Sequence, residues 1–113
     1  MTPAGGRRVH YTVVMPHDLR FEWDPAKAAA NLRRHGVSFH EAESVFLDEH
    51  ALLIDDPDHS ESEDRFVLLG LSASLRVILV CHCYRAEGGI VRIISARKAD
   101  RQERAAYLGR LQR

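Results

Sequence analysis

The chain has 113 residues, 45% of them hydrophobic and 28% charged, which is typical of one globular domain with a single modest core. Sixteen basic and sixteen acidic residues cancel, so the total charge argues against a simple nucleic-acid binder. The longest apolar run, Val77–Cys81, is too short to cross a bilayer, and the N-terminus has no apolar signal core, so we expect a cytoplasmic protein without a membrane segment.

The charges are unevenly distributed along the chain. Residues 1–20 hold three arginines and one aspartate, a net charge of +2, and residues 21–64 hold three basic and twelve acidic residues, a net charge of −9. Residues 65–113 hold ten basic and three acidic residues, a net charge of +7. Two interpretations stay open: the oppositely charged segments neutralise each other within the fold, or the basic segment meets an anionic partner.

The predicted elements start after residues 1–18, an N-terminal extension that is either disordered or adds an edge strand, and residues 19–113 form the single domain. A short strand is expected at Leu19–Trp23. The pair Asp24-Pro25 then begins a helix, because Asp caps free backbone amides and Pro suits the first helical turn.

A second helix follows the first closely. Gly36 ends the first helix, since glycine favours the conformation of a C-terminal stop. Ser38 with Glu41 has the spacing of a capping box and begins the second helix. The apolar stripe of this second helix consists of Phe39, Ala42, Val45 and Phe46.

The rest of the chain predicts strands and a last helix. The strands are expected at Ala51–Ile54, Arg65–Leu71, Arg76–Tyr84 and Ile90–Arg97. Asp100 with Glu103 caps a helix that continues to about Leu111. The order β-α-α-β-β-β-β-α predicts an α+β fold, with two N-terminal helices, an antiparallel sheet of about four to five strands and a C-terminal helix.

The two cysteines, Cys81 and Cys83, lie two residues apart on a predicted strand and so share a face, while His82 points to the other face. A disulfide at this spacing would be strained, and no second pair of ligands accompanies them to bind zinc. We expect both to be small core residues. The remaining histidines are scattered, so we expect no metal and no cofactor.

Three segments carry a family resemblance: FEWDPAKAAANLRRHGVSFHEAESVFLD, then EDRF with Gly70 five residues after Arg65, then RIISARKADRQERAAYL. In this order and spacing they resemble the BrnT family, the toxins of type II toxin–antitoxin pairs, over about residues 20–108. The chain departs from the family in its longer segment ahead of Leu19, and in Arg34, where the family commonly has Lys.

The resemblance implies a RelE-like α+β ribonuclease fold and RNA cleavage that arrests translation. It also implies neutralisation by a co-expressed, BrnA-like antitoxin, and binding of operator DNA only through that antitoxin. A homodimer, or a heterotetramer with the antitoxin, is the assembly to expect of such a pair.

RNA cleavage without a metal uses the 2′-hydroxyl of RNA as nucleophile, so the protein must hold the phosphate, neutralise its charge and move two protons. Arginine suits the second task because its planar fork stays charged and binds two phosphate oxygens. Alternation puts Arg92 and Arg97 on opposite faces of their strand, but Arg97 stands at the strand end, where its direction is freer. We therefore prefer Arg97 and Lys98 slightly over Arg92. We expect arginines from separate strand ends to converge on one phosphate pocket, the alternative being ion pairs with the carboxylates of residues 55–64.

Several other candidates each have a structural alternative. Glu63 could act as a base beside a phosphate-bound Arg65, or it could only form an ion pair with it. Arg85 closes the next strand and either joins the cationic patch or lies on the surface of a hairpin. His35 could carry a proton, or it could only bond to the free carbonyls at the end of its helix.

The remaining candidates lie on the predicted helices or at their ends. Tyr107 could stack on a base or donate a proton, or it could pack in the core. RNA contacts are further predicted for Lys27, Arg33, Arg34 and Arg101.

Two other functions compete with an endoribonuclease. The helix pair could be the helix-turn-helix of a non-catalytic regulator, but DNA phosphates would repel its second helix. That helix and the residues after it carry Glu41, Glu43, Asp48 and Glu49 and no basic residue. The basic C-terminal segment could instead dock an acidic protein. The sequence favours a metal-independent endoribonuclease toxin with an arginine-rich sheet face as its site.

Overall fold

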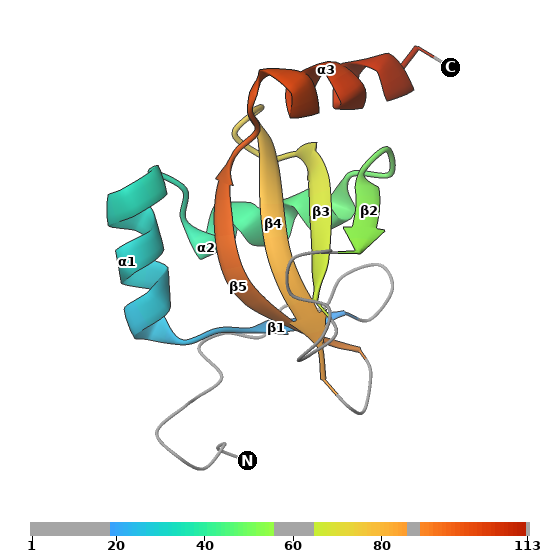
Figure 1. The fold of residues 1–113 in the computed structure, drawn as a ribbon. Coiled ribbons are helices and arrows are strands. Elements are labelled where there is room, and N and C mark those ends of the chain that lie inside the picture. Colours follow the sequence, from blue (N-terminus) through green and yellow to red (C-terminus); the bar gives the residue numbers. More distant parts are fainter. Residues whose placement is uncertain (1–18, 56–64, 86–88, 113) are drawn as a thin grey trace.

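The computed structural model of the protein describes residues 19–55, 65–85 and 89–112 (Figure 1). The elements are β1 (Arg20–Glu22), α1 (Pro25–His35), α2 (Phe39–Ser44), the 3-10 turn η1 (Val45–Leu47), β2 (Leu52–Asp55), β3 (Phe66–Leu71), β4 (Val77–Tyr84), β5 (Ile90–Lys98) and α3 (Arg101–Arg110). The predicted α+β fold and its element order are confirmed. The prediction for residues 1–18 lies outside the described residues.

The five strands form one sheet in the order β1-β5-β4-β3-β2. The strands from β2 to β5 pair antiparallel, as predicted, but β1 runs parallel to β5, so the sheet is mixed. The expectation of a purely antiparallel sheet is corrected in this strand. The sequence of a three-residue strand does not indicate which strand it pairs with or in which direction. The partner of β1, β5, is also distant in the sequence.

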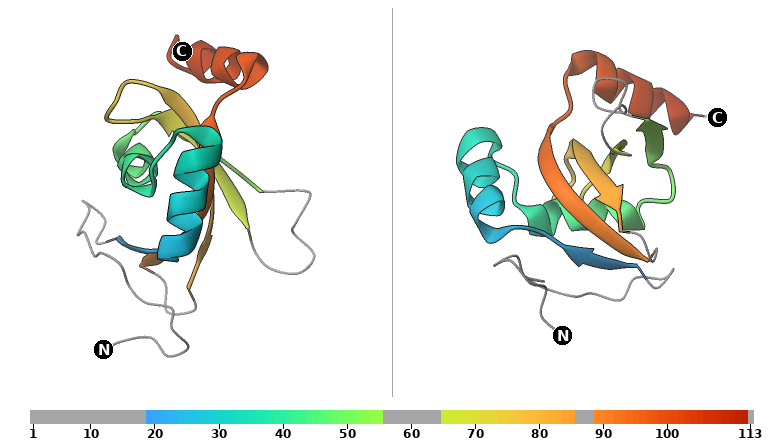
Figure 2. Two further views of the ribbon diagram at one scale, coloured as in Figure 1. Left: turned by 90° about the vertical axis from the view of Figure 1, so that its left-hand side faces the viewer. Right: turned by 60° about the horizontal axis from the view of Figure 1, so that its bottom comes forward.

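The two faces of the sheet are covered unequally (Figures 1 and 2). On one face α1 and α2 pack over the main core, which includes Phe21, Phe39, Val80 and Ile93. On the other face α3 crosses one end of the sheet, where Tyr107 packs with Leu69 and Val77. No other described helix lies over this second face.

Local signals at the helix ends are formed as the sequence indicates. The Asp24 carboxylate accepts a bond from the Ala26 amide at 3.0 Å, and Gly36 has a φ of 70°, which glycine adopts without strain. Asp100 and Glu103 form a complete capping box. At Ser38 only half of the predicted box is present, because Glu41 bonds to Arg76 and Ser72 instead of reaching back.

Gly70 of β3 lies against the side chains of Val45, Asp48 and Ala51, in and just after η1. A Cβ atom at this position would lie 2.9 Å from Ala51 Cβ and from Val45 Cγ1, closer than real contacts allow. We predict that Gly70→Ala lowers the free energy of unfolding by ~1–3 kcal/mol, the usual cost of overpacking, as measured by urea denaturation.

The matched control is Gly109→Ala in α3, where nothing lies within 4 Å of the added Cβ. This substitution removes the helix penalty of glycine and should raise stability by ~0.5–1 kcal/mol. Equal effects of the two substitutions would contradict the packing of η1 against β3.

Candidate functional site

One face of the sheet is covered by a described helix only at one end, and we call it the open face. The strand register defines its residues, because partners across an antiparallel ladder point to the same side. Val80 and its partner Ala96 lie in the core under α1 and α2. Their neighbours point the other way, so the open face contains Leu79, Cys81 and Cys83 of β4 with Arg97, Ser95 and Arg92 opposite them.

A β-bulge decides where the arginines of β5 point. The pairing of β4 with β5 skips Ile94, which has no partner across the ladder. This extra residue reverses the alternation between Arg92 and Arg97, and both therefore lie on the open face. The prediction that they occupy opposite faces is wrong, because alternation counts residues and the bulge adds one.

Further arginines share this face. Arg65 directly precedes β3 and Arg85 directly follows β4, and alternation along these strands puts both on the open side. Sequence analysis did not select Arg20 of β1, which also belongs here because its neighbour Phe21 points into the core. Alternation around that buried phenylalanine was the signal that could have identified it.

The arginines of β5 are already paired with carboxylates of neighbouring elements. Arg92 Nη1 donates to Glu22 Oε2 at 3.0 Å, and Arg85 donates to the same oxygen. The fork of Arg97 donates twice to Glu103, at 2.9 Å and 3.0 Å. The predicted alternative of ion pairing is thus present through Glu22 and Glu103, while the carboxylates predicted as partners, at residues 55–64, lie outside the described side chains.

The two arginines do not converge on one point. Their partners on β4, Cys83 and Leu79, are four residues apart, which corresponds to ~13 Å along a strand. Their side chains also turn toward different carboxylates, on β1 and on α3. The expected phosphate pocket between strand-end arginines is therefore not formed by Arg92 and Arg97, but an extended chain of phosphates could contact them one after the other.

The Arg97 guanidinium is held firmly as a cation. Its hydrogen bonds to Glu103 raise the pKa of Arg97, and the same bonds lower the pKa of Glu103. A permanently charged group can neutralise a phosphate but cannot transfer protons. Proton transfer must therefore come from a different side chain.

Three of the predicted basic residues lie off the open face. Lys98 pairs with the core residue Ile78 and so belongs to the opposite side of the sheet. Arg101 begins α3, and Arg33 is exposed on α1.

A small basic pocket lies between α1 and β5. One side of α1 supplies Lys27 and Arg34, the C-terminal end of the helix supplies His35, and the bulge supplies Ile94 and Ser95. The cavity has a volume of about 180 Å³. Because Ser95 belongs to the open face, the pocket borders that face. The structure thus brings together three residues that were predicted separately.

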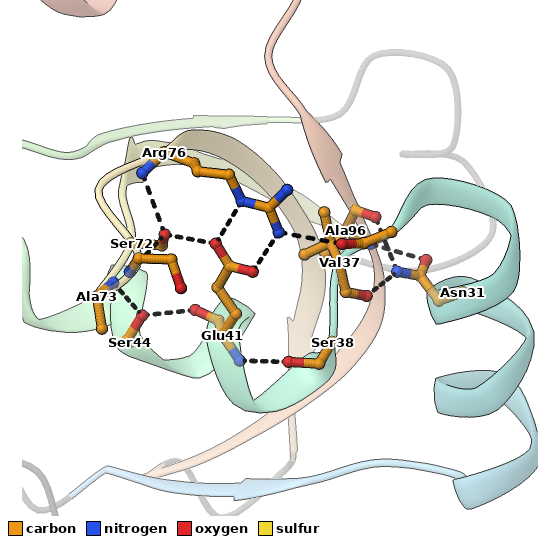
Figure 3. Close-up of polar contacts among 11 residues, drawn as sticks. Asn31, Val37, Ser38, Glu41, Ser44, Ser72, Ala73, Arg76 and Ala96 are labelled. Carbon is orange, nitrogen blue, oxygen red and sulfur yellow. Dashed lines mark hydrogen bonds and ion pairs between the residues drawn. The ribbon is translucent and has the colours of Figure 1, made fainter.

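Asn31 joins the two walls of this pocket (Figure 3). Its Nδ2 donates to the carbonyls of Ala96 at 2.8 Å and Val37 at 2.9 Å, and its Oδ1 accepts from the Ala96 amide at 3.1 Å. Arg76 adds a bond from Nη2 to the Gly36 carbonyl at 3.0 Å. Sequence analysis missed Asn31, although a poor helix former inside a helix is a signal for such a role.

Tyr107, another predicted candidate, does not reach the site. Tyr107 is buried, and its hydroxyl donates to Asp48 Oδ2 at 2.6 Å. Burial and this carboxylate raise the pKa of Tyr107 to about 12. It therefore ties α3 to the sheet, and we leave it out of the site. Glu63 lies outside the described residues.

The segment Cys81-His82-Cys83 contradicts one expectation. Both cysteines are only half-buried, on the open face, so their prediction as core residues is wrong. His82 is the core residue of this segment, fully buried against Phe46, and burial lowers its pKa to about 4. An imidazole that stays neutral in the core takes no part in the site.

In the described part of the chain, no three His, Cys, Asp or Glu side chains gather closely enough to hold a metal ion. None of the described helices has the length and apolar character needed to span a membrane.

The fold and the open face define a small α+β protein with a positively charged sheet surface beside a basic pocket. A family model described as the ribonuclease toxin BrnT of type II toxin–antitoxin systems matches residues 23–103. This match covers more than two thirds of the chain, so the protein belongs to the BrnT family of ribonuclease toxins. It includes α1 and all of β5, the elements that form the pocket. No curated protein matches the sequence.

The strongest carboxylate shift lies away from the site, in Glu43 of α2. Its side chain is buried, Oε1 has no hydrogen-bond partner, and burial raises its pKa from 4.5 to about 7. The folded state therefore holds this proton more tightly than the unfolded chain, so the contribution of Glu43 to stability is present below pH 4.5 and is lost as the pH rises through 7.

We predict that Glu43→Gln gains stability over the native chain by up to ~2–3 kcal/mol at about pH 8 and by little at about pH 4.5. Urea denaturation at both values measures the difference. Glu49→Gln, at an exposed position, is the control and should show no such pH-dependent gain. An equal gain for Glu43→Gln at both values would mean that the carboxyl is not desolvated.

Proposed function

We propose that the protein is a metal-independent endoribonuclease toxin of RelE-like fold that holds RNA along its open face and cleaves it to arrest translation in the cytoplasm. The observation that carries the proposal is the position of Arg65, Arg85, Arg92 and Arg97 on one side of the sheet. Membership of a ribonuclease toxin family supports the substrate class.

The carboxylates on this face support RNA binding. Glu22 and Glu103 hold their arginine partners in fixed directions while no ligand is present. A carboxylate and a phosphate both offer two oxygens to a guanidinium fork, so phosphates can take over bonds that carboxylates now make. Among the described residues, Arg85 and Arg92 share the single carboxylate of Glu22, so positive charge exceeds negative charge within this pair of contacts.

The reaction that fits such a site is attack of the RNA 2′-oxygen on the adjacent phosphorus. The bond from phosphorus to the 2′-oxygen forms, the bond to the 5′-oxygen breaks, and the products are a 2′,3′-cyclic phosphate and a 5′-hydroxyl. One proton leaves the 2′-hydroxyl and one reaches the 5′-oxygen. His35, at the C-terminal end of α1, supplies an imidazole, a group that can both donate and accept a proton.

The same face suits the antitoxin as a partner. A BrnA-like antitoxin with acidic side chains could occupy the arginines in place of phosphates and so block RNA. Operator DNA would then be bound by the antitoxin, in a heterotetramer or around a toxin homodimer. The second helix, α2, carries no lysine or arginine, which favours this arrangement over DNA binding by the helix pair.

We predict that the purified chain degrades RNA in the presence of EDTA. The double variant Arg92→Ala with Arg97→Ala should remain folded and lose at least ~100-fold in cleavage efficiency, since each lost cation removes a charge-assisted bond that holds the RNA on the open face. Expression of this variant should no longer arrest growth.

The charge-matched control is Arg104→Ala, an exposed residue of α3 that belongs neither to the open face nor to the pocket. It should cleave as the native chain does. Intact RNA with the native chain, or growth arrest by the double variant, would refute the assigned face.

Cys81 and Cys83 offer a direct footprint of RNA on the open face, since both are half-buried there and neither is in a disulfide. We predict that a non-cleavable 2′-O-methyl RNA slows alkylation of both thiols by iodoacetamide, as followed by mass spectrometry. A cysteine introduced by Ala29→Cys, in the separate groove between α1 and α2, should react equally fast with and without RNA. Unchanged alkylation of Cys81 and Cys83 would place the RNA elsewhere.

A further inference from the structure

We propose that the basic pocket between α1 and β5 binds the phosphate at which RNA is cleaved, and that Asn31 is the residue that positions its walls. This inference rests on the proposed function, because it assigns the reacting group of the RNA to one place beside the open face.

The first argument is electrostatic. Lys27, Arg34 and His35 line the pocket, and its lining includes no Asp or Glu. Within the described residues no carboxylate pairs with Lys27 or Arg34, whereas Arg92 and Arg97 each hold one. The open face is thus partly neutralised in the unliganded protein, and the pocket retains its positive charge. An anion gains most where cations have no other partner.

The second argument is size and chemistry. A volume of about 180 Å³ compares with ~30 Å³ for one water in the liquid, so a phosphate with its ester oxygens fits. Two cations of different shape are available, the compact ammonium of Lys27 and the planar fork of Arg34. Ser95 and His35 also line the pocket, and both residue types can hydrogen-bond to a phosphate oxygen.

The third argument is access from the open face. Ser95 shares the face of Arg97 by alternation along β5, so it belongs to the open face, and it also lines the pocket. An RNA chain that follows the arginines of β5 therefore passes the pocket entrance. A phosphate can enter the pocket while its neighbours stay on Arg92 and Arg97.

Asn31 links the walls that carry these groups. It lies four residues after Lys27, three before Arg34 and four before His35, so all three flank it on one side of α1. Its amide bonds to both backbone groups of Ala96, which directly follows Ser95 in β5. Asn31 itself would touch no reacting atom, and its role is to hold α1 at a fixed distance from β5.

Binding can be tested with inorganic phosphate and the full chain, followed by NMR. We expect phosphate to shift the signals of the His35 ring and the Ser95 amide. Lys27→Ala or Arg34→Ala should each weaken phosphate binding about tenfold, the effect of one lost charge-assisted bond. Arg33→Ala, one position away but outside the pocket lining, should weaken it clearly less, and Arg104→Ala should leave it unchanged.

Cleavage assays distinguish the phosphate that is cut from a terminal phosphate of the RNA. If the pocket holds the cleaved group, Lys27→Ala and Arg34→Ala lower kcat while 2′-O-methyl RNA still binds along the open face, and a 5′-phosphate on that RNA adds no affinity. Tighter binding of 5′-phosphorylated RNA, with internal cleavage unaffected by these variants, would overturn the assignment. Phosphate shifts confined to other residues would also overturn it.

Asn31→Ala tests the positioning role. We expect kcat to fall with KM little changed in the folded fraction, which is the pattern of a group that acts on the transition state through others. Loss of activity only in proportion to the unfolded fraction would show that Asn31 has a purely structural role. The Lys27 and Arg34 variants test the pocket independently of the Asn31 variant.

The phosphate titration needs no nuclease activity, so phosphate binding without RNA cleavage would refute the proposed function and retain the pocket.

Discussion

The fold of this protein depends on which groups bond to the backbone N–H and C=O groups along the edge of β5. β1 pairs with β5 only as far as Arg92, and the backbone groups beyond that point need other partners. The amide of Asn31 supplies them at Ala96, with a donor and an acceptor in the manner of a neighbouring strand, and it bonds to Val37 as well. One side chain therefore closes the sheet edge, fixes α1 beside it and holds the turn that leads into α2. The basic pocket lies beside these bonds, between α1 and β5, and Asn31 itself belongs to its lining.

The positive charges of the open face and those of the basic pocket differ in whether carboxylates pair with them. On the open face Glu22 and Glu103 neutralise part of it and hold the arginines in defined directions. In the pocket the cations of α1 have no such partners among the described residues. Among the described residues, burial shifts the pKa most in His82, to about 4, and in Glu43, to about 7, and both lie in or near the core, separate from both places. These two shifts thus mark burial, and the candidate chemistry lies with exposed and half-buried groups.

Sequence reasoning succeeded where the determining interaction is local. The caps at Asp24, Gly36 and Asp100 depend on residues within one helical turn, and all three are formed. It failed at the half-formed capping box, because Arg76, distant in the sequence, takes the Glu41 carboxylate away from the helix end. It also failed for the direction of β1, because strand pairing is decided by which edge remains open.

The amino-acid sequence alone determined the element order, the helix ends, the family and the residue types available for phosphate binding, since these follow from short-range propensity and motif spacing. Only the tertiary structure decided which of those residues act together. The bulge at Ile94 brings Arg92 and Arg97 to one face, and the Asn31 amide brings Lys27, Arg34 and His35 beside Ser95. The Asn31 bond joins residues that are 65 positions apart in the sequence, and the bulge belongs to the pairing of β4 with β5. In each case the backbone hydrogen bonds between two segments, and not the residue type, decide which way the side chains point.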